Sequence, residues 1–362
     1  MNKNVWLFSK RTDLLFLFLP VWLVWVWAFT GDLENKSLPN WAWFVFILGI
    51  DVCHVWSTIF RTYLNKNDRL NHKKSIRYIP LILAPILFGT ALISAQFFWS
   101  VLAYIAVFHF IKQQYGFMAL YAFKKKEKRS TLKKRLDKWT IYTGMVYPII
   151  FWHFDKERSF NWFIDHDFLP MFELIDSIQI FSYLNIAYFI LLLIWIGSEI
   201  KIAKQNGFAW GKVLWVLSTS LNWYIGIVHF NSDYIFSVTN VVAHGVPYLV
   251  LIIKYKIGEE EIEKGKKLQF TEALMNSFSV IVLVFFIGFF EEYFWDMLVN
   301  LERHEIFEIV SPYWINIEHS PTLIALATAL LTLPQATHYV LDGIIWKFNN
   351  SNPNLKKIIE NG

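Results

Sequence analysis

The sequence predicts an all-α fold: a polytopic integral-membrane helical bundle of about ten transmembrane helices. Three observations lead to this prediction. Hydrophobic residues make up 55% of the 362-residue chain, which is above the share typical of a soluble domain. Several apolar runs approach the roughly 20 residues that cross a bilayer as a helix. The charged residues gather in the short connections between those runs.

Each predicted span is an apolar run between charged or turn-forming segments. The first run follows Lys3, Lys10 and Arg11 as a secretory signal would, but it is bulky and lacks a small-residue cleavage site, so it reads as a retained span. The fifth run is short for a crossing, and the fourth is long enough to tilt or protrude. The ten predicted spans are 13–30, 41–63, 77–95, 97–123, 139–154, 178–200, 212–230, 234–255, 272–297 and 321–346.

Charge in the connections predicts the orientation. The connection 124–138 is rich in Lys and Arg, whereas 155–177 and 298–320 are acidic. Because basic connections mark the cytoplasmic side, we predict that both termini are cytoplasmic. Residues 1–348 are predicted to form a single transmembrane domain. A polar cytoplasmic tail, 349–362, follows, and its Asn-rich start is expected to be disordered.

Several function classes are excluded by what the chain lacks. Cys53 is the only cysteine, so an intramolecular disulfide or an all-cysteine metal site cannot form. No Walker or Rossmann glycine loop is present, which argues against nucleotide-driven chemistry. The net charge of +5 comes from short loops between spans, and this placement indicates topology, so no nucleic-acid partner is expected.

The main functional signal is a histidine within each of four predicted spans. Asp51 precedes the first of them by three residues and Asp342 follows the last by four, so each carboxylate shares a helical face with an imidazole. Ionisable groups at this depth are costly unless they meet partners inside the bundle. We therefore predict that six side chains converge on one interior cavity: Asp51, His54, His109, His244, His338 and Asp342.

Three further residues are candidates for the same site. Arg61 lies on the face of Asp51, and Gln113 lies on the face of His109. Arg61 would serve as a counter-charge or bind an anionic headgroup, although interfacial snorkelling explains it equally well. His229, at the outer end of the seventh predicted span, is a fifth metal ligand if that helix is displaced, and otherwise an interfacial residue.

Imidazole and carboxylate together suit iron, zinc, manganese or copper. Iron is the predicted metal, because hydrolytic zinc chemistry needs water and these histidines lie among Phe and Trp. The arrangement resembles the histidine-rich integral-membrane oxygenases and desaturases, which hold iron between imidazoles from several helices. The resemblance implies a metal-dependent oxidoreductase acting on a lipid or isoprenoid. The bacterial carotene-cleaving membrane oxygenases are similar in size and in their scattered intramembrane histidines. The HxxxH and HxxHH boxes of desaturases are absent, and no family is assigned.

The expected partners are membrane lipids, an apolar small-molecule substrate and a redox partner. Three other functions stay open. A bis-histidine haem protein would show a Soret band. A proton- or ion-coupled transporter, with the His/Asp cluster as its relay, would move its substrate unchanged. A structural membrane protein would tolerate alanine at all four histidines, because a single histidine in a membrane helix often only bonds to a neighbouring helix.

Overall fold

The computed structural model describes residues 5–158, 160–169, 171, 178–300, 302–308 and 320–361. Over these residues the regular secondary structure is helical, without strands, which confirms the all-α class. Eight helices in this part of the chain are long and apolar enough to cross a membrane, as in a multi-pass membrane protein. They are Lys10–Thr30, Asn40–Arg61, Lys73–Ile93, Ala95–Lys124, Ile180–Lys204, Asp233–Lys264, Phe270–Asn300 and Pro321–Ile345.

The two other predicted spans, 139–154 and 212–230, are also helical. The first belongs to α8 (Thr131–Phe154), which begins in the Lys-rich segment and is therefore less apolar. The second is split between α10 (Trp210–Trp223) and the π-helix η5 (Tyr224–His229). Neither is among the eight candidate membrane helices, so a total of ten spans stays a prediction.

The chain forms two compact units, each assembled from segments that are distant in sequence. Unit 1 comprises Met1–Ser37, Val107–Pro247 and Ile359–Gly362, and unit 2 comprises Leu38–Ala106 and Tyr248–Ile358. Three helices of the described chain have residues in both units: α7 (Ala95–Lys124), α11 (Asp233–Lys264) and α15 (Pro353–Asn361). The single domain over residues 1–348 stays a prediction.

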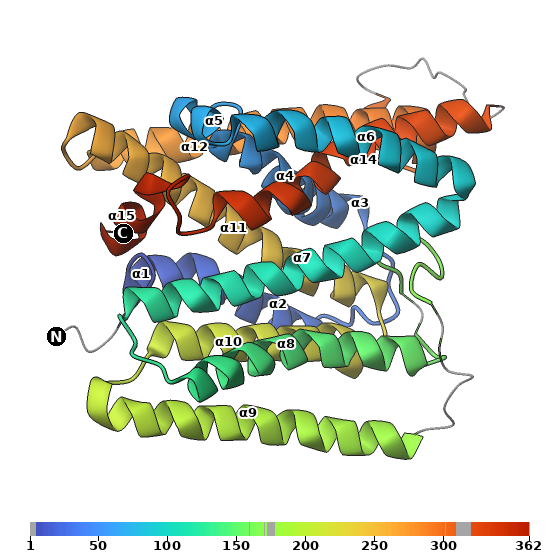
Figure 1. Ribbon diagram of the computed structural model, residues 1–362. Coiled ribbons are helices and arrows are strands. Elements are labelled where there is room, and N and C mark those ends of the chain that lie inside the picture. Colours follow the sequence, from blue (N-terminus) through green and yellow to red (C-terminus); the bar gives the residue numbers. More distant parts are fainter. Residues whose placement is uncertain are drawn as a thin grey trace. The chain divides into compact units, whose positions relative to one another are not determined.

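Unit 1 is built around helices that pack side by side. Its elements are α1 (Lys10–Thr12), η1 (Asp13–Phe18), α2 (Leu19–Thr30), α8, α9 (Ile178–Asn206), α10 and η5, with parts of α7 and α11. Helices α8, α9 and α10 lie next to one another (Figure 1). Gly144 on α8 permits this closeness, because a Cβ there would lie only 2.4 Å from Ser220 Oγ on α10.

A buried ion-pair network joins the basic connection 124–138 to α9 and α10 within unit 1. The Lys212 ammonium lies 3.0 Å from Glu127, 3.1 Å from Asp137 and 2.7 Å from Glu199. Lys133 adds contacts of 2.8 Å to Asp137 and 2.7 Å to Glu199. Buried charges need such partners because each one loses its hydration on folding.

Unit 2 contains the helix Asn40–Arg61, whose winding changes along its length. Its parts are α3 (Asn40–Ala42), the π-helix η2 (Trp43–Val52), α4 (Cys53–Ser57) and the 3₁₀-helix η3 (Thr58–Arg61). The other elements of this unit are α5 (Lys66–Asn71), α6 (Lys73–Ile93), α12 (Phe270–Trp295), η6 (Asp296–Asn300), α13 (His304–Phe307), α14 (Pro321–Ile345) and most of α15 (Pro353–Asn361).

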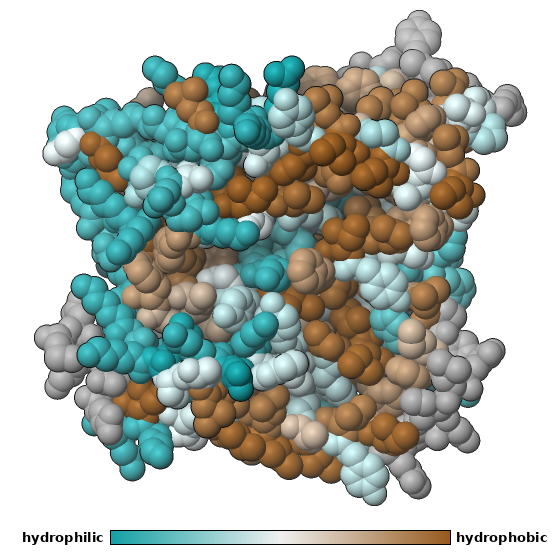
Figure 2. Space-filling view, viewed as in Figure 1, coloured by the Kyte–Doolittle hydropathy of each residue, from teal (hydrophilic) through white to brown (hydrophobic). Residues whose placement is uncertain are grey.

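Helices α6 and α14 run side by side within unit 2 (Figure 1). The outer face of α6 is apolar, as the brown surface over this helix in Figure 2 shows. Its exposed large side chains include Leu81, Ile82, Ile86 and Ile93. Such an apolar face, exposed among the described residues, fits contact with lipid chains.

The end of the chain is more ordered than its polar composition predicts. Asn352 is buried, and its side-chain oxygen accepts a hydrogen bond from Arg61 at 3.0 Å and lies 2.7 Å from His72 Nε2. Its amide group donates to the backbone oxygen of Lys347 at 2.8 Å. Helix α15 then buries Leu355, Ile358 and Ile359. The disorder expected at 349–354 is therefore wrong, because one asparagine supplies partners for several backbone and side-chain groups.

Candidate functional site

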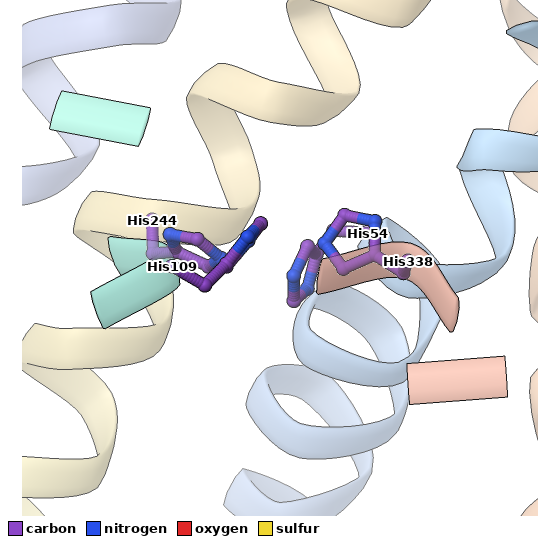
Figure 3. Close-up of side chains that lie close together, drawn as sticks. All are labelled: His54, His109, His244 and His338. Carbon is purple, nitrogen blue, oxygen red and sulfur yellow. The ribbon is translucent and has the colours of Figure 1, made fainter. Parts of the chain in front are cut away.

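Four buried histidines form a cluster. Each offers one ring nitrogen, and these nitrogens lie within 4.8 Å of one another (Figure 3). Their exposed fractions are 4% or less. The members are His54, His109, His244 and His338, the same four histidines that the sequence pattern selects.

In unit 1, His109 of α7 lies beside His244 of α11. Their ring centroids are 5.1 Å apart and the ring planes meet at 78°. The imidazole of His244 stacks on Phe110, with 3.5 Å between centroids and an angle of 10°. This stack fixes the plane of the His244 ring, because a rotated imidazole would lose the contact with the aromatic face.

Helix α11 continues through Pro247, and two glutamines of α7 donate to its backbone beside this proline. Pro247 has no N–H, so the backbone oxygen of Ala243 loses its helical partner. Gln114 donates to this oxygen at 3.1 Å, and Gln113 donates to the backbone oxygen of His244 at 2.8 Å. Gln113 therefore holds the backbone that carries His244. The buried Gln114 was not selected from the sequence, although its position beside Gln113 was a usable signal.

In unit 2, His54 of α4 lies beside His338 of α14. Their ring centroids are 5.1 Å apart at an angle of 80°. Asp51 Oδ1 lies 3.3 Å from His54 Nδ1, and Asp342 Oδ1 lies 3.6 Å from His338 Nδ1. The helical spacings predicted from the sequence thus place each carboxylate beside its own imidazole.

Two hydroxyl groups link His338 to Asp342. Thr58 Oγ1 lies 2.7 Å from His338 Nδ1 and 2.9 Å from the Tyr248 hydroxyl. Tyr248 donates to Asp342 Oδ1 at 2.5 Å. Thr58 follows His54 by four residues on the same helix, but sequence alone gave no reason to prefer it over other polar neighbours.

Arg61 occupies a place that the sequence did not predict. Its side chain is fully buried, so it neither snorkels nor reaches a lipid headgroup. Its Nε lies 3.4 Å from Asp68 Oδ2, and its guanidinium lies 3.7 Å above the ring of Tyr255. Burial raises the pKa of the Asp68 carboxyl, and the Arg61 charge opposes this shift. Arg61 therefore has a structural partner in Asp68, and its direct contacts are with this network and not with the four histidines.

The structure places His229 outside the cluster. This residue ends η5 and is exposed. Its ring packs against Phe29, at 5.2 Å between centroids, and against Phe230, at 4.7 Å. The four-histidine group does not include it, which agrees with the interfacial alternative.

The histidine group is close to the dimensions of a mononuclear metal site. A metal–imidazole bond of about 2.0–2.1 Å puts two ligand nitrogens on one ion at most about 4.2 Å apart. The group spans up to 4.8 Å, so shifts of about half an ångström would bring its nitrogens onto a single ion. Four neutral imidazoles suit iron, zinc, copper or nickel.

Comparison with protein-family models, with curated proteins and with solved structures finds no match for this chain. Any functional conclusion therefore depends on the chemistry of the site itself.

Proposed function

We propose that the protein is a metal-dependent membrane oxidoreductase that acts on an apolar substrate, with His54, His109, His244 and His338 as ligands of an iron ion. The observation that carries this proposal is the convergence of four buried ring nitrogens within 4.8 Å. A single histidine in a membrane helix has ordinary structural explanations. Four imidazoles with so small a separation are a chemical arrangement that metal binding explains directly.

Two considerations favour iron and redox chemistry over the other functions. Hydrolytic metal chemistry requires water at the ion, whereas these histidines are buried. A bis-histidine haem would need a planar macrocycle between two of the imidazoles, and four nitrogens so close together leave little room for one. An iron ion held by imidazoles would supply one-electron and dioxygen chemistry.

An apolar substrate agrees with the surroundings of the site. The candidate membrane helices expose long apolar faces, such as Leu193 and Ile194 on α9 and Phe286 on α12. A substrate dissolved in the bilayer would reach a buried site without crossing water. Asp51 and Asp342 would orient the imidazoles of His54 and His338, as carboxylates beside metal-bound histidines commonly do.

The proposal is tested by elemental analysis of the detergent-purified protein. His109→Ala and His338→Ala are each expected to lose the bound metal while circular dichroism shows an unchanged helix content. His229→Ala is the matched control and should keep the metal, because that histidine is exposed and outside the cluster. A wild-type protein without metal after iron reconstitution, or alanine variants that keep both metal and activity, would refute the proposal.

A further inference from the structure

Four polar side chains of unit 2 form one hydrogen-bonded chain. It begins at His338 Nδ1, continues through Thr58 Oγ1 at 2.7 Å and the Tyr248 hydroxyl at 2.9 Å, and ends at Asp342 Oδ1 at 2.5 Å. The distances alone leave the donors of the first two bonds open. The last bond, to the carboxyl group of Asp342, determines which group donates in each of the first two bonds.

Each hydroxyl has one proton to donate. An ionised Asp342 can only accept, so Tyr248 donates its proton to it. The Tyr248 oxygen then accepts the proton of Thr58. Thr58 then has no proton left for the imidazole, and its oxygen must accept from His338 Nδ1. The indole N–H of Trp346 also donates to the Tyr248 oxygen, at 3.4 Å, which agrees with this oxygen as an acceptor.

We infer that Thr58 and Tyr248 are positioning residues that keep the proton of His338 on Nδ1 and thereby make Nε2 the metal-ligating atom. A neutral imidazole has one protonated nitrogen and one nitrogen with a lone pair, and only the latter binds a metal. The carboxylate of Asp342 thus selects the ligand atom of His338 across three hydrogen bonds. The inference rests on the proposed function for its consequence in metal binding, whereas the position of the proton follows from the hydrogen bonds together with the ionised state of Asp342.

A merely structural role for these hydroxyls would predict a different response to mutation. Thr58→Val keeps the shape of the side chain but removes its hydroxyl, and Thr58→Ser keeps the hydroxyl. If the hydroxyl fixes the tautomer, only the valine variant should disturb His338. Loss of a group that orients a metal-bound histidine costs about 10–100-fold in metal affinity, and we expect a loss of this size for Thr58→Val and for Tyr248→Phe.

The direct test is ¹⁵N NMR of the metal-free protein labelled at histidine, with His338→Gln to assign the signal of His338. We expect Nδ1 protonation in the wild type and in Thr58→Ser, and a shift toward the other tautomer in Thr58→Val and Tyr248→Phe. Competition with a chelator then gives the affinity for iron and zinc in the same four proteins.

The outcomes separate the two proposals. A wild-type His338 protonated on Nε2, or an unchanged tautomer in both hydroxyl-deleted variants, overturns the positioning role. Nδ1 protonation in a wild-type protein that binds no metal leaves the positioning role standing and refutes the metal site. Metal affinity that falls in Thr58→Val and returns in Thr58→Ser supports both.

Discussion

The side chain of Lys212 is 1% exposed, and its ammonium group lies among three carboxylates. Removing one member of such a group costs about 3–5 kcal/mol, because a buried charge stays behind without its partner. The sequence indicated only a basic connection at 124–138, because its partners Glu199 and Lys212 are 60 or more residues away from it. By contrast, the four cluster histidines were predictable, because a histidine inside an apolar run is conspicuous without any tertiary information.

The network predicts an acid-sensitive stability. Burial opposes ionisation of Asp137, but Lys212 and Lys133 outweigh it and hold the pKa of Asp137 below its usual value. A carboxyl group of this kind adds stability above its unfolded pKa of about 3.9 and loses that contribution as the pH falls through its lower folded pKa. We expect the Tm in detergent to fall below about pH 4, with a shallower decline in Asp137→Asn.

The control for this pH series is Asp32→Asn, because the Asp32 side chain is 86% exposed and its pair with Lys36 is at the surface. This variant should follow the wild type at every pH. If Asp137→Asn declined as steeply as the wild type, the acid sensitivity would have another origin.

At the scale of the element, the helix Asn40–Arg61 shows which contacts the helical periodicity of the sequence predicts and which it does not. An even helical wheel puts His54, Thr58 and Arg61 on one face. His54 and Thr58 do share a neighbour, since both contact His338. Arg61 instead reaches Asp68 and Asn352, after the helix has tightened to 3₁₀ geometry. The wheel assumes one pitch throughout, and a sequence does not display where the pitch changes.

The space around two glycines predicts different effects for their substitution by alanine. Gly144→Ala should destabilise the protein by about 1–3 kcal/mol, the usual cost of overpacking, because its Cβ would collide with Ser220. Gly197→Ala on α9 has open space around its Cβ and should be neutral or stabilising by up to about 1 kcal/mol. Denaturant unfolding of both variants in the same detergent measures the difference. A comparable response at the two sites would contradict this packing.

At the scale of the whole molecule, composition predicted most of the membrane helices. Eight of the ten predicted spans coincide with helices long and apolar enough to cross a bilayer. The division into two compact units was not predictable, because each unit joins segments from distant parts of the chain. Hydropathy predicts which segments avoid water, but it does not predict which segments pack against one another.

The topology prediction depends on whether α8 crosses the membrane. Lys128 and Lys156 lie on either side of this helix, and both are exposed. Single cysteines at these positions, in a Cys53→Ala background, should react with an impermeant thiol reagent from opposite sides of sealed vesicles. Ten spans with both termini cytoplasmic require position 128 to be cytoplasmic. Labelling of both positions from the same side would show that α8 does not cross.

The π-helical winding of η2, directly before His54, bears on how the chain tolerates changes of length. In a π-helix, hydrogen bonds join residues five apart, whereas an α-helix joins residues four apart. The stretch Trp43–Val52 therefore contains more residues than an α-helix would need to connect the same two flanking segments. Losing one residue there would let the stretch rewind while both flanks keep their register. The same loss from a regular α-helix such as α6 would rotate everything beyond it by about 100°. Single-residue gaps between this chain and its evolutionary relatives should accordingly be more frequent at 43–52 than within α6.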